Sequence, residues 1–385
     1  MYRTVNLLII CLLSSANLIL SQDLPVLNLS NALDNPTIIS VSDFIESIEY
    51  IPLETTSESL VGNNPKIIVT DDYIITRTYR KCLVFSRDNG EFITELGHYG
   101  RDPGGYKTNL GLFNELSSIY YFRGWNHDLI KYSLSGEFLG SIKIELNDKV
   151  TEAIASPDAF SYLSDTILVC QLVCLDGTEP YSFYIFDANG NLLKAIPNKM
   201  RLSKKQEMNF NTPELKFHRY NGNVFFQSFY CDTIYKLLIN DIKPAFLLKS
   251  GKYLRPYESK WWSIAKRKRS DYITIPTYFE NSRFIAFDMY KKSARYFGLY
   301  NKSNRTLKIS ENTYGILNNL DGFINPTFIA INESEELLGF AYPSEILLWF
   351  EQNTDKINSL RPAVKQLKGI NESDNPVIII AKFKK

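Results

Sequence analysis

Short apolar runs separated by turn residues dominate the chain from about Thr37 onward. Their spacing follows the two-residue period of a strand and not the 3.6-residue period of a helix. The clearest case is 82–96, in which two strand-like halves flank Asp88-Asn89-Gly90. An Asn-Gly pair supplies the positive φ angles that a tight hairpin turn needs. This segment therefore predicts a β-hairpin.

The same strand–turn–strand phrase recurs along the chain. Residues 129–139 repeat it around Gly136 and residues 183–193 repeat it around Gly190, whereas 233–241 and 296–307 turn on Asn or Asp. The copies are spaced roughly 45 to 60 residues apart, and each repeat unit reads as several short strands, which is typical of β-propeller blades. A linear β-solenoid would show a much shorter period, and a sandwich would show no sequence repeat.

Three late segments and one early segment do not follow this strand–turn–strand pattern. Residues 343–360 predict an amphipathic helix capped by Ser344, and 362–367 predict a second short helix. Residues 375–383 form a continuous apolar run at the C-terminus, and 44–53 form a strand-like run near the N-terminus. Pairing these two strands would close a ring and leave no long unpaired edge. The predicted fold is an all-β, six-bladed β-propeller, closed by N- and C-terminal strands, with a helical insertion in the last blade.

The first residues have the order of a secretory signal: Arg3, the apolar run 5–13 and then small residues. The apolar run is shorter than the ~20 residues that a membrane-spanning helix needs. We expect a signal peptide over 1–21, cleaved after Ala16 or Ser21, a linker over 22–36 and the propeller over 37–385. A lipid anchor on Cys11 is disfavoured because Ile10 precedes it. The mature chain is therefore predicted to be exported to the periplasm or outer cell surface, to have no transmembrane segment and to be a monomer.

Overall charge gives no support to one group of partners. The 43 basic and 42 acidic residues nearly cancel, which removes any global electrostatic argument for nucleic acid or an anionic membrane.

Four cysteines follow the predicted signal: Cys82, Cys170, Cys174 and Cys231. Residues four apart on one strand lie about 13 Å apart, too far for a disulfide between Cys170 and Cys174. We interpret these cysteines as small buried hydrophobic residues, and the sequence leaves their disulfide state open.

Chemistry-bearing motifs are sparse. His98, His127 and His218 belong to no metal-ligand spacing, and no nucleophile elbow, phosphate loop or dinucleotide fingerprint occurs. Asp88 and Asp187 serve hairpin turns. We therefore predict no catalytic residue, no metal ligand and no cofactor.

One local feature is a weak candidate for ligand binding, in which aromatic and basic residues alternate. Basic side chains beside indole rings could hold an acidic polysaccharide or a nucleic-acid backbone, although export argues against nucleic acid. The alternative is a solvated insertion under which the tryptophans pack. The candidate residues are Trp261, Trp262, Lys266, Arg267, Lys268 and Arg269.

Four phrases in the correct order resemble an exported six-bladed β-propeller family, NHL-like and TolB-like in architecture, that is abundant in Bacteroidetes. They are residues 50–55, 84–92, 100–106 and 374–383. The third resembles a Gly-x-Gly-Pro-Gly-Glu-Tyr loop, but Asp102 stands where glycine is usual and Gly105 where glutamate is usual. No role of that glutamate can therefore be transferred. The resemblance implies a propeller and no established catalytic residues.

These observations favour a binding or interaction module whose ligand is an unknown glycan, peptide or envelope protein. The alternative is a hydrolase or lyase that uses carboxylates or a metal at the central channel, because propellers host both classes. Convergence of the three histidines or of three carboxylates would favour an enzyme. A site lined by exposed aromatic and neutral polar side chains would favour binding. A third alternative, a structural subunit, predicts a flat apolar patch of several hundred Å².

Overall fold

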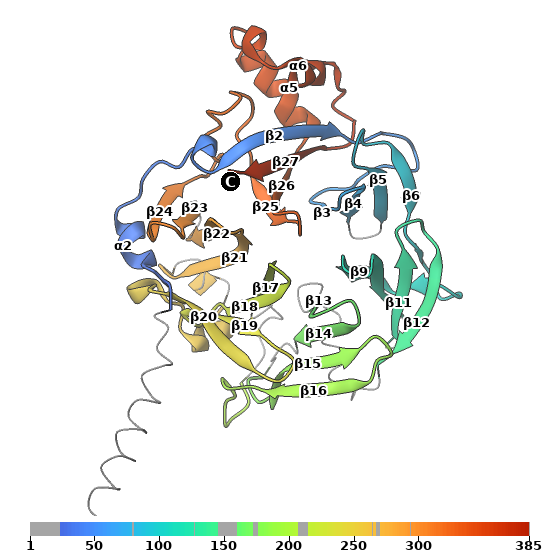
Figure 1. The fold of residues 1–385 in the computed structure, drawn as a ribbon, viewed down its shortest axis with the longest axis vertical. Coiled ribbons are helices and arrows are strands. Elements are labelled where there is room, and N and C mark those ends of the chain that lie inside the picture. Colours follow the sequence, from blue (N-terminus) through green and yellow to red (C-terminus); the bar gives the residue numbers. More distant parts are fainter. Residues whose placement is uncertain are drawn as a thin grey trace, which may run out of the picture.

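The computed structural model describes residues 24–78, 81–126, 128–144, 160–171, 176–206, 215–263, 265–266, 270–292 and 294–384. Six sheets, antiparallel except for the added strand β1 (Val26–Leu27), stand around a common axis in the order of the sequence, so the protein is the six-bladed β-propeller that the sequence predicts (Figure 1). We number the blades from the sheet that contains β3. In each blade the strands start at the axis and proceed outward in chain order, except that the outermost strands of blades 4 and 6, β1 and β2 (Ile45–Pro52), come from the N-terminal part of the chain.

The first three blades are simple four-stranded meanders. Blade 1 comprises β3 (Lys66–Val69), β4 (Tyr73–Arg77), β5 (Cys82–Ser86) and β6 (Phe92–Glu95). Blade 2 comprises β9 (Thr108–Asn114), β10 (Ile119–Arg123), β11 (Asp128–Ser133) and β12 (Phe138–Lys143). Blade 3 comprises β13 (Phe160–Tyr162), β14 (Ile167–Gln171), β15 (Tyr181–Asp187) and β16 (Leu192–Pro197). The short strands β7 (His98–Tyr99) and β8 (Gly105–Tyr106) pair in parallel between blades 1 and 2.

The last three blades contain the additions to this plan. Blade 4 comprises β17 (Leu215–Tyr220), β18 (Asn223–Ser228), β19 (Thr233–Leu237) and β20 (Ile242–Leu248), with β1 (Val26–Leu27) as a fifth strand. Blade 5 comprises β21 (Ile273–Glu280), β22 (Phe284–Lys291), β23 (Ala294–Asn301) and β24 (Thr306–Glu311). Blade 6 comprises β25 (Phe328–Ile331), β26 (Glu336–Ala341), β27 (Val377–Phe383) and β2 (Ile45–Pro52).

Each predicted hairpin is the third and fourth strand of one of the first five blades. Two structural constraints favour glycine at the turn of these hairpins. Gly90, Gly136 and Gly190 have φ of 76°, 87° and 88°, which disfavour any side chain. A Cβ at Gly90 would also lie 2.0 Å from the carbonyl oxygen of Pro52, and one at Gly190 would lie 2.3 Å from that of Lys143. The hairpin turn of each of these blades therefore packs against the end of the outer strand of the preceding blade.

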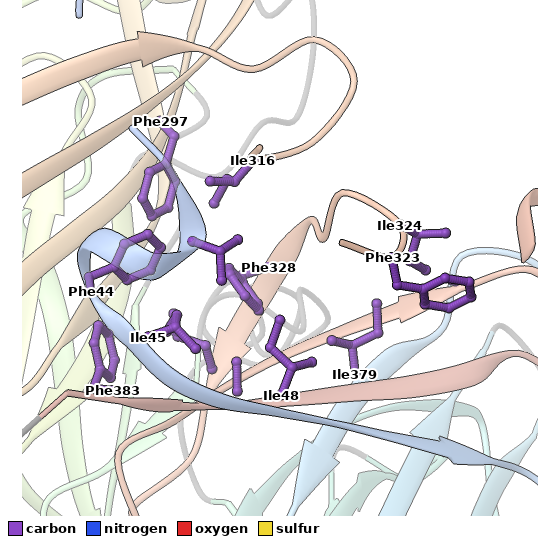
Figure 2. Close-up of a cluster of buried hydrophobic side chains, with 14 of the residues drawn as sticks. Phe44, Ile45, Ile48, Phe297, Ile316, Phe323, Ile324, Phe328, Ile379 and Phe383 are labelled. Carbon is purple, nitrogen blue, oxygen red and sulfur yellow. The ribbon is translucent and has the colours of Figure 1, made fainter. Parts of the chain in front are cut away.

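Blade 6 lacks this hairpin because its two outer strands come from opposite ends of the chain. β2 pairs antiparallel with β27, from Ile45 opposite Phe383 to Pro52 opposite Val377. The predicted closure is present. Phe44 adds to it in the core between blades 5 and 6, where its ring stacks on Phe297 at 5.4 Å and lies 6.1 Å from the ring of Phe383 (Figure 2).

The predicted helical insertion lies between β26 and β27 and projects beyond the rim of the ring (Figure 1). It contains α5 (Pro343–Gln352), α6 (Pro362–Gln366) and the 3₁₀ turns η5 (Ile357–Ser359) and η6 (Leu367–Gly369). The prediction of Ser344 as the cap is wrong. The N-cap is Tyr342, two residues before Ser344, and the helix starts at Pro343, whose fixed φ suits the first helical position. The Glu345 carboxylate accepts a hydrogen bond from the Tyr342 N–H at 2.9 Å.

The segment before β2 is partly ordered onto the ring. β1 pairs in parallel with β20, and α2 (Leu29–Asp34) buries Leu29, Ala32 and Leu33 in the core of blades 4 and 5. The 3₁₀ turn η1 (Val41–Asp43) then leads into β2. Residues 26–34, within the predicted linker, therefore pack against the propeller.

The two ends of the ring differ in the length of their connections. The turns between the first and second strands of each blade are short and lie near the axis; they include 115–118, 281–283 and 332–335. We call this end the short-turn end. The opposite end, the long-connection end, carries the links between blades and those between second and third strands, among them 249–272, 312–327 and 342–376. Loops held on rigid strands are the usual place for recognition, so a binding site is expected at this end.

Candidate functional site

A groove of about 640 Å³ lies at the long-connection end, between α5 and the connection 312–327. We call it the α5 groove. Its aromatic lining residues are Tyr314, Phe323, Phe340 and Trp349, and its amide-bearing lining residues are Asn318, Asn325, Gln352 and Asn353. Tyr314 is 88% exposed at this groove, whereas Phe323 is buried. The groove therefore combines an accessible ring with an apolar floor and neutral hydrogen-bonding groups.

Hydrogen bonds hold the 312–327 wall of this groove in one shape. The Asn318 amide donates to Asp321 Oδ1 at 2.6 Å and to the Ile324 carbonyl at 3.0 Å. The Tyr50 hydroxyl of β2 donates to Asp321 Oδ2 at 3.2 Å, and Arg361 Nη2 lies 3.2 Å from the same oxygen. Burial, together with the nearby Asp321 carboxylate, raises the pKa of Tyr50 well above its usual value, so the hydroxyl stays a donor. The wall is anchored to the closing blade and to the insertion.

The α5 wall presents rings and few charges. The Trp349 indole packs edge-on against Phe323 with ring centroids 4.8 Å apart, and Leu348 is half exposed beside it. Two charged residues line the groove, and both have partners. The Glu345 carboxylate caps α5, and Lys356 Nζ donates to Asn353 Oδ1 at 2.9 Å. A ligand in this groove therefore meets no strong net charge.

The aromatic and basic residues singled out from the sequence lie in the connection between blades 4 and 5, which contains the 3₁₀ turns η3 (Gly251–Tyr253) and η4 (Tyr257–Trp261). The structure separates the two tryptophans. Trp261 is half-buried, edge-on to Tyr257 at 5.3 Å and against Gly177 of blade 3. Trp262 instead has Lys266 Nζ 3.8 Å above its ring.

Trp262 and Lys266 line a second cavity of about 640 Å³, together with Lys252, Asp271 and Tyr272. The Tyr272 ring lies 6.0 Å from that of Trp262. Sequence reasoning missed Lys252 and Tyr272, because both lie outside the basic run. The predicted residues Arg267, Lys268 and Arg269 lie outside the described part of the chain, as does His127.

The two described histidines do not meet. His98 is exposed in the loop between blades 1 and 2, where Nε2 lies 2.7 Å from Asp102 Oδ2. His218 is buried and lies 3.1 Å from Glu280 Oε2, and Lys302 Nζ lies 2.7 Å from Glu280 Oε1. Burial alone would raise the pKa of Glu280, but the hydrogen bond from His218 and the charge of Lys302 outweigh it and lower that pKa.

The loop 100–106 is built around close backbone contacts. A Cβ at Gly105 would lie 2.6 Å from the Gly100 carbonyl oxygen, so the glutamate that is usual there could not be placed without moving the loop. The Tyr132 hydroxyl donates to the Gly104 carbonyl at 2.9 Å, and the Trp125 indole N–H donates to the Gly100 carbonyl at 2.5 Å.

Carboxylates gather at the axis at the short-turn end. The turn 332–335 between β25 and β26, which we call the hub turn, brings Glu333 beside Arg219 of blade 4, with Nε 2.5 Å from Oε1. The Tyr162 hydroxyl of blade 3 donates to the same oxygen at 3.1 Å. Glu115 of blade 2 lies in this cluster, and burial, reinforced by the nearby Glu333 charge, raises its pKa to about 7.

Within the described ranges, no set of three or more His, Cys, Asp or Glu side chains is arranged to hold a metal ion. Cys82, Cys170 and Cys231 are free thiols, and burial raises the pKa of the Cys82 and Cys170 thiols to about 12. Cys174 lies outside the described residues. None of the helices seen in the described segments has both the length and the hydrophobicity to cross a bilayer.

The fold and the geometry above define a six-bladed β-propeller with a ligand-sized groove at its long-connection end. Residues 24–382 match the family described as Domain of unknown function DUF4934, and the chain belongs to this family. A solved structure of a Bacteroides fragilis protein described as exported is similar to it, with a TM-score of 0.68 and 16% identity over 91% of this chain and 98% of that one. At this identity the likeness establishes the fold alone.

Another solved structure, dihydro-heme d1 dehydrogenase NirN in complex with DHE, matches with a TM-score of 0.36 and 10% identity over 64% of this chain and 56% of that one. This similarity is too low to carry an argument. A comparison with curated proteins gives no match.

Proposed function

We propose that this chain is an exported binding module that holds a neutral ligand, a glycan or a peptide, in the α5 groove. The observation that carries the proposal is the exposed Tyr314 ring at a 640 Å³ groove whose other polar lining is mainly amide. Pockets of this size with an apolar floor and a few directional polar groups suit small ligands. An exposed aromatic ring offers apolar stacking area with little conformational freedom to lose.

Rigidity of the groove supports the same function. The Asn318–Asp321 hydrogen bonds and the contact of Asp321 with Tyr50 hold the 312–327 wall before any ligand arrives. A wall that is already ordered loses little entropy on binding. The wall and the helix both lie on the closing blade, so recognition is coupled to the integrity of the ring.

Export to the periplasm or the outer cell surface is part of the proposal. The signal-like order of residues 1–21 supports it, and so does the description of the similar Bacteroides fragilis protein as exported. The assignment to an NHL-like or TolB-like group and an origin in Bacteroidetes stay predictions. An envelope protein as the ligand, and a monomeric state, also stay predictions.

Trp262 and Lys266 support a subsidiary proposal, a second contact for an acidic group on a larger ligand. The cavity that they line with Lys252 and Tyr272 is open, and cations beside ring faces suit carboxylated or sulfated sugars.

The hydrolase or lyase alternative would assign acid–base chemistry to Glu115 and Glu333. Both of these carboxyls are engaged by groups of other blades at the short-turn end, away from the α5 groove, so the binding function is favoured.

The test is to screen the purified mature chain against arrays of neutral glycans and peptides, followed by calorimetry on each hit. We expect Tyr314→Ala to weaken binding at least about tenfold, which corresponds to 1.4 kcal/mol. Tyr99→Ala is the matched control, because Tyr99 is another exposed ring, 66% accessible, in the connection between blades 1 and 2. Hits whose affinity is unaffected by Tyr314→Ala, or an absence of hits in both arrays, would reject the α5 groove as the binding site.

A further inference from the structure

A smaller cavity of about 160 Å³ adjoins the α5 groove. The two share Leu317 and Asn325 as lining residues, and Ile38 and Ile39 of the segment before β2 form another wall of the smaller one. We call it the Ile38 cavity. Part of its lining is buried and belongs to the core between blades 5 and 6 (Figure 2). The connection 312–327 therefore borders two cavities in succession, and one elongated ligand could reach both.

Exposed apolar side chains are concentrated at these two cavities. The described residues include six large hydrophobic side chains that are at least half exposed, and four of these line the two cavities: Ile38, Leu317, Tyr314 and Leu348. Single exposed hydrophobic residues are normal on a protein surface, whereas a group of them marks an interaction site. The apolar surface of the α5 groove thus continues past Leu317 to Ile38.

The aliphatic character of this surface distinguishes between the two classes of neutral ligand. Ile38, Leu317 and Leu348 have no ring face on which a sugar could stack. Hydroxyl groups of a sugar that were buried against these side chains would lose their hydrogen bonds to water without replacement. An apolar peptide side chain would lose only apolar contact with water, which is favourable. The surface therefore suits a peptide better than a glycan.

The polar lining matches the groups of a peptide backbone. Asn312 lines the Ile38 cavity and is only 5% exposed, and neither atom of its side-chain amide has a hydrogen-bond partner among the described residues. A buried amide without partners is costly, and a peptide group has the donor and the acceptor that could satisfy both atoms. The charged residue of this cavity, Glu311, accepts a hydrogen bond from the Thr313 hydroxyl at 3.3 Å. The Ile38 cavity thus offers no cation to an anionic membrane.

We propose that a peptide segment of another protein binds across the α5 groove and the Ile38 cavity through two apolar side chains. One side chain lies beside Tyr314 and Leu348, and the second lies between Ile38 and Leu317. The peptide backbone bonds to the amide of Asn312 after that side chain turns toward the cavity. This inference rests on the proposed function of the α5 groove and narrows its ligand to a peptide.

Binding of short uncharged peptides to the purified mature chain tests the proposal. Hits from a peptide array are measured by fluorescence anisotropy, and a neutral glycan array is screened in parallel. We expect peptide hits with two apolar residues, each of which weakens binding when replaced by serine. Ile38→Ser should weaken binding at least about fivefold, because it removes apolar contact area from the second cavity. Ile93→Ser, at an exposed isoleucine of β6, is the matched control and should leave the affinity unchanged.

The outcomes separate this inference from the function on which it rests. Loss of peptide affinity in both Tyr314→Ala and Ile38→Ser would support it. Peptide binding that responds to Tyr314→Ala alone would keep the α5 groove as the site and overturn its extension to Ile38. Glycan hits without peptide hits would overturn the peptide as ligand.

Other occupants of the surface give different results. A chain that dimerises in sedimentation experiments, with the dimer lost in Ile38→Ser, would assign the surface to a second copy and overturn the proposal. Ile38-dependent binding to phosphatidylethanolamine–phosphatidylglycerol vesicles would assign it to a membrane, with the same consequence. An absence of hits in both arrays would reject the proposed function and this inference together.

Discussion

The Tyr162 hydroxyl donates a hydrogen bond to Glu333 Oε1 at 3.1 Å, although the two residues belong to blades 3 and 6, on opposite sides of the ring. Arg219 of blade 4 binds the same carboxylate and lies flat over the Tyr162 ring. The axis at the short-turn end is thus crossed by a polar contact that links opposite blades.

Arg219→Gln should destabilise the fold by about 2 kcal/mol. The substitution leaves Glu333 and Glu115 without their cation in a site where the Arg219 side chain is only 14% exposed, and breaking a buried pair is costly. Urea denaturation monitored by tryptophan fluorescence measures the change. Arg305→Gln, in an exposed turn of blade 5, is the control and should stay within about 0.5 kcal/mol. A loss of similar size in both variants would refute a special role for Arg219.

Glu115 should give the protein an alkaline decline in stability. Its pKa is raised in the folded state, so the folded chain binds more protons than the unfolded chain between about pH 4.5 and 7. The stabilising contribution is complete below 4.5 and is lost as the pH rises toward 7. Glu115→Gln should therefore raise the stability at pH 8 by about 1–2 kcal/mol and leave it nearly unchanged at pH 4.5. Thermal unfolding of the unsubstituted protein and of Glu115→Gln at both pH values checks this prediction. It fails if the difference in stability between the two proteins is the same at pH 4.5 and at pH 8.

Glu280 should have the opposite effect on the pH dependence of stability and give the protein a decline at acidic pH. Its pKa is lowered in the folded state by His218 and Lys302 against the effect of burial, so its contribution is present above about pH 4.5 and is lost as the pH falls through the folded value. Glu280→Gln should cost stability at pH 7 and less at pH 3. Chemical denaturation at the two pH values measures the difference, and an equal cost at both would contradict the ion-pair argument.

Gly90→Ala should cost more than 3 kcal/mol, and a matched glycine separates the two causes. Gly90 has φ of 76° and its Cβ would lie 2.0 Å from the Pro52 carbonyl oxygen. Gly222 has φ of 68° with nothing within 4 Å of a Cβ. Gly222→Ala therefore measures the left-handed backbone alone, at about 1–2 kcal/mol. Equal losses in thermal or urea unfolding would mean that contact between blades contributes nothing.

Removing 377–385 should prevent stable folding. β27 pairs with both β2 and β26, and its loss would leave blade 6 without a strand and two edges unpaired. Circular dichroism and thermal unfolding of the truncated chain measure the effect. A milder variant, Phe44→Ala, should cost about 3–4 kcal/mol, because this ring is buried at the same closure. An unchanged melting temperature in the truncated chain would remove the closure argument.

Much of the fold could be predicted because it depends on local signals. Turn glycines such as Gly90 are needed both for their φ and for contact with the preceding blade, so the phrase around them recurs and reveals the repeat. The terminal apolar run 375–383 is also a local signal, because a continuous stretch of apolar residues indicates a strand that is buried on both faces. The position of the α5 cap was mispredicted because Glu345 stabilises the helix start from inside the helix.

The sites could not be predicted in the same way. Tyr314 and Trp349 are 35 residues apart in the chain and meet at one groove only through the order of strands in blade 6. Glu115, Arg219 and Glu333 come from three blades, and no spacing along the sequence relates them. The run 312–325 is rich in asparagine and glycine, which could have marked it as a long structured connection. For Trp261 and Trp262, adjacency in sequence was misleading, because their rings face different surroundings.

The pairing of β2 with β27 sets the order of events during synthesis. β2 is among the first strands to be synthesised, and its partner β27 is the last. β2 therefore has no strand to pair with until Val377, the partner of Pro52, and the residues after it have been made. Contacts between such distant parts of a chain are slow to form because a long loop must close first. The nascent protein therefore stays an open arc with an unsatisfied strand at each end, and it is most vulnerable to proteases and to chaperone capture until its last residues arrive.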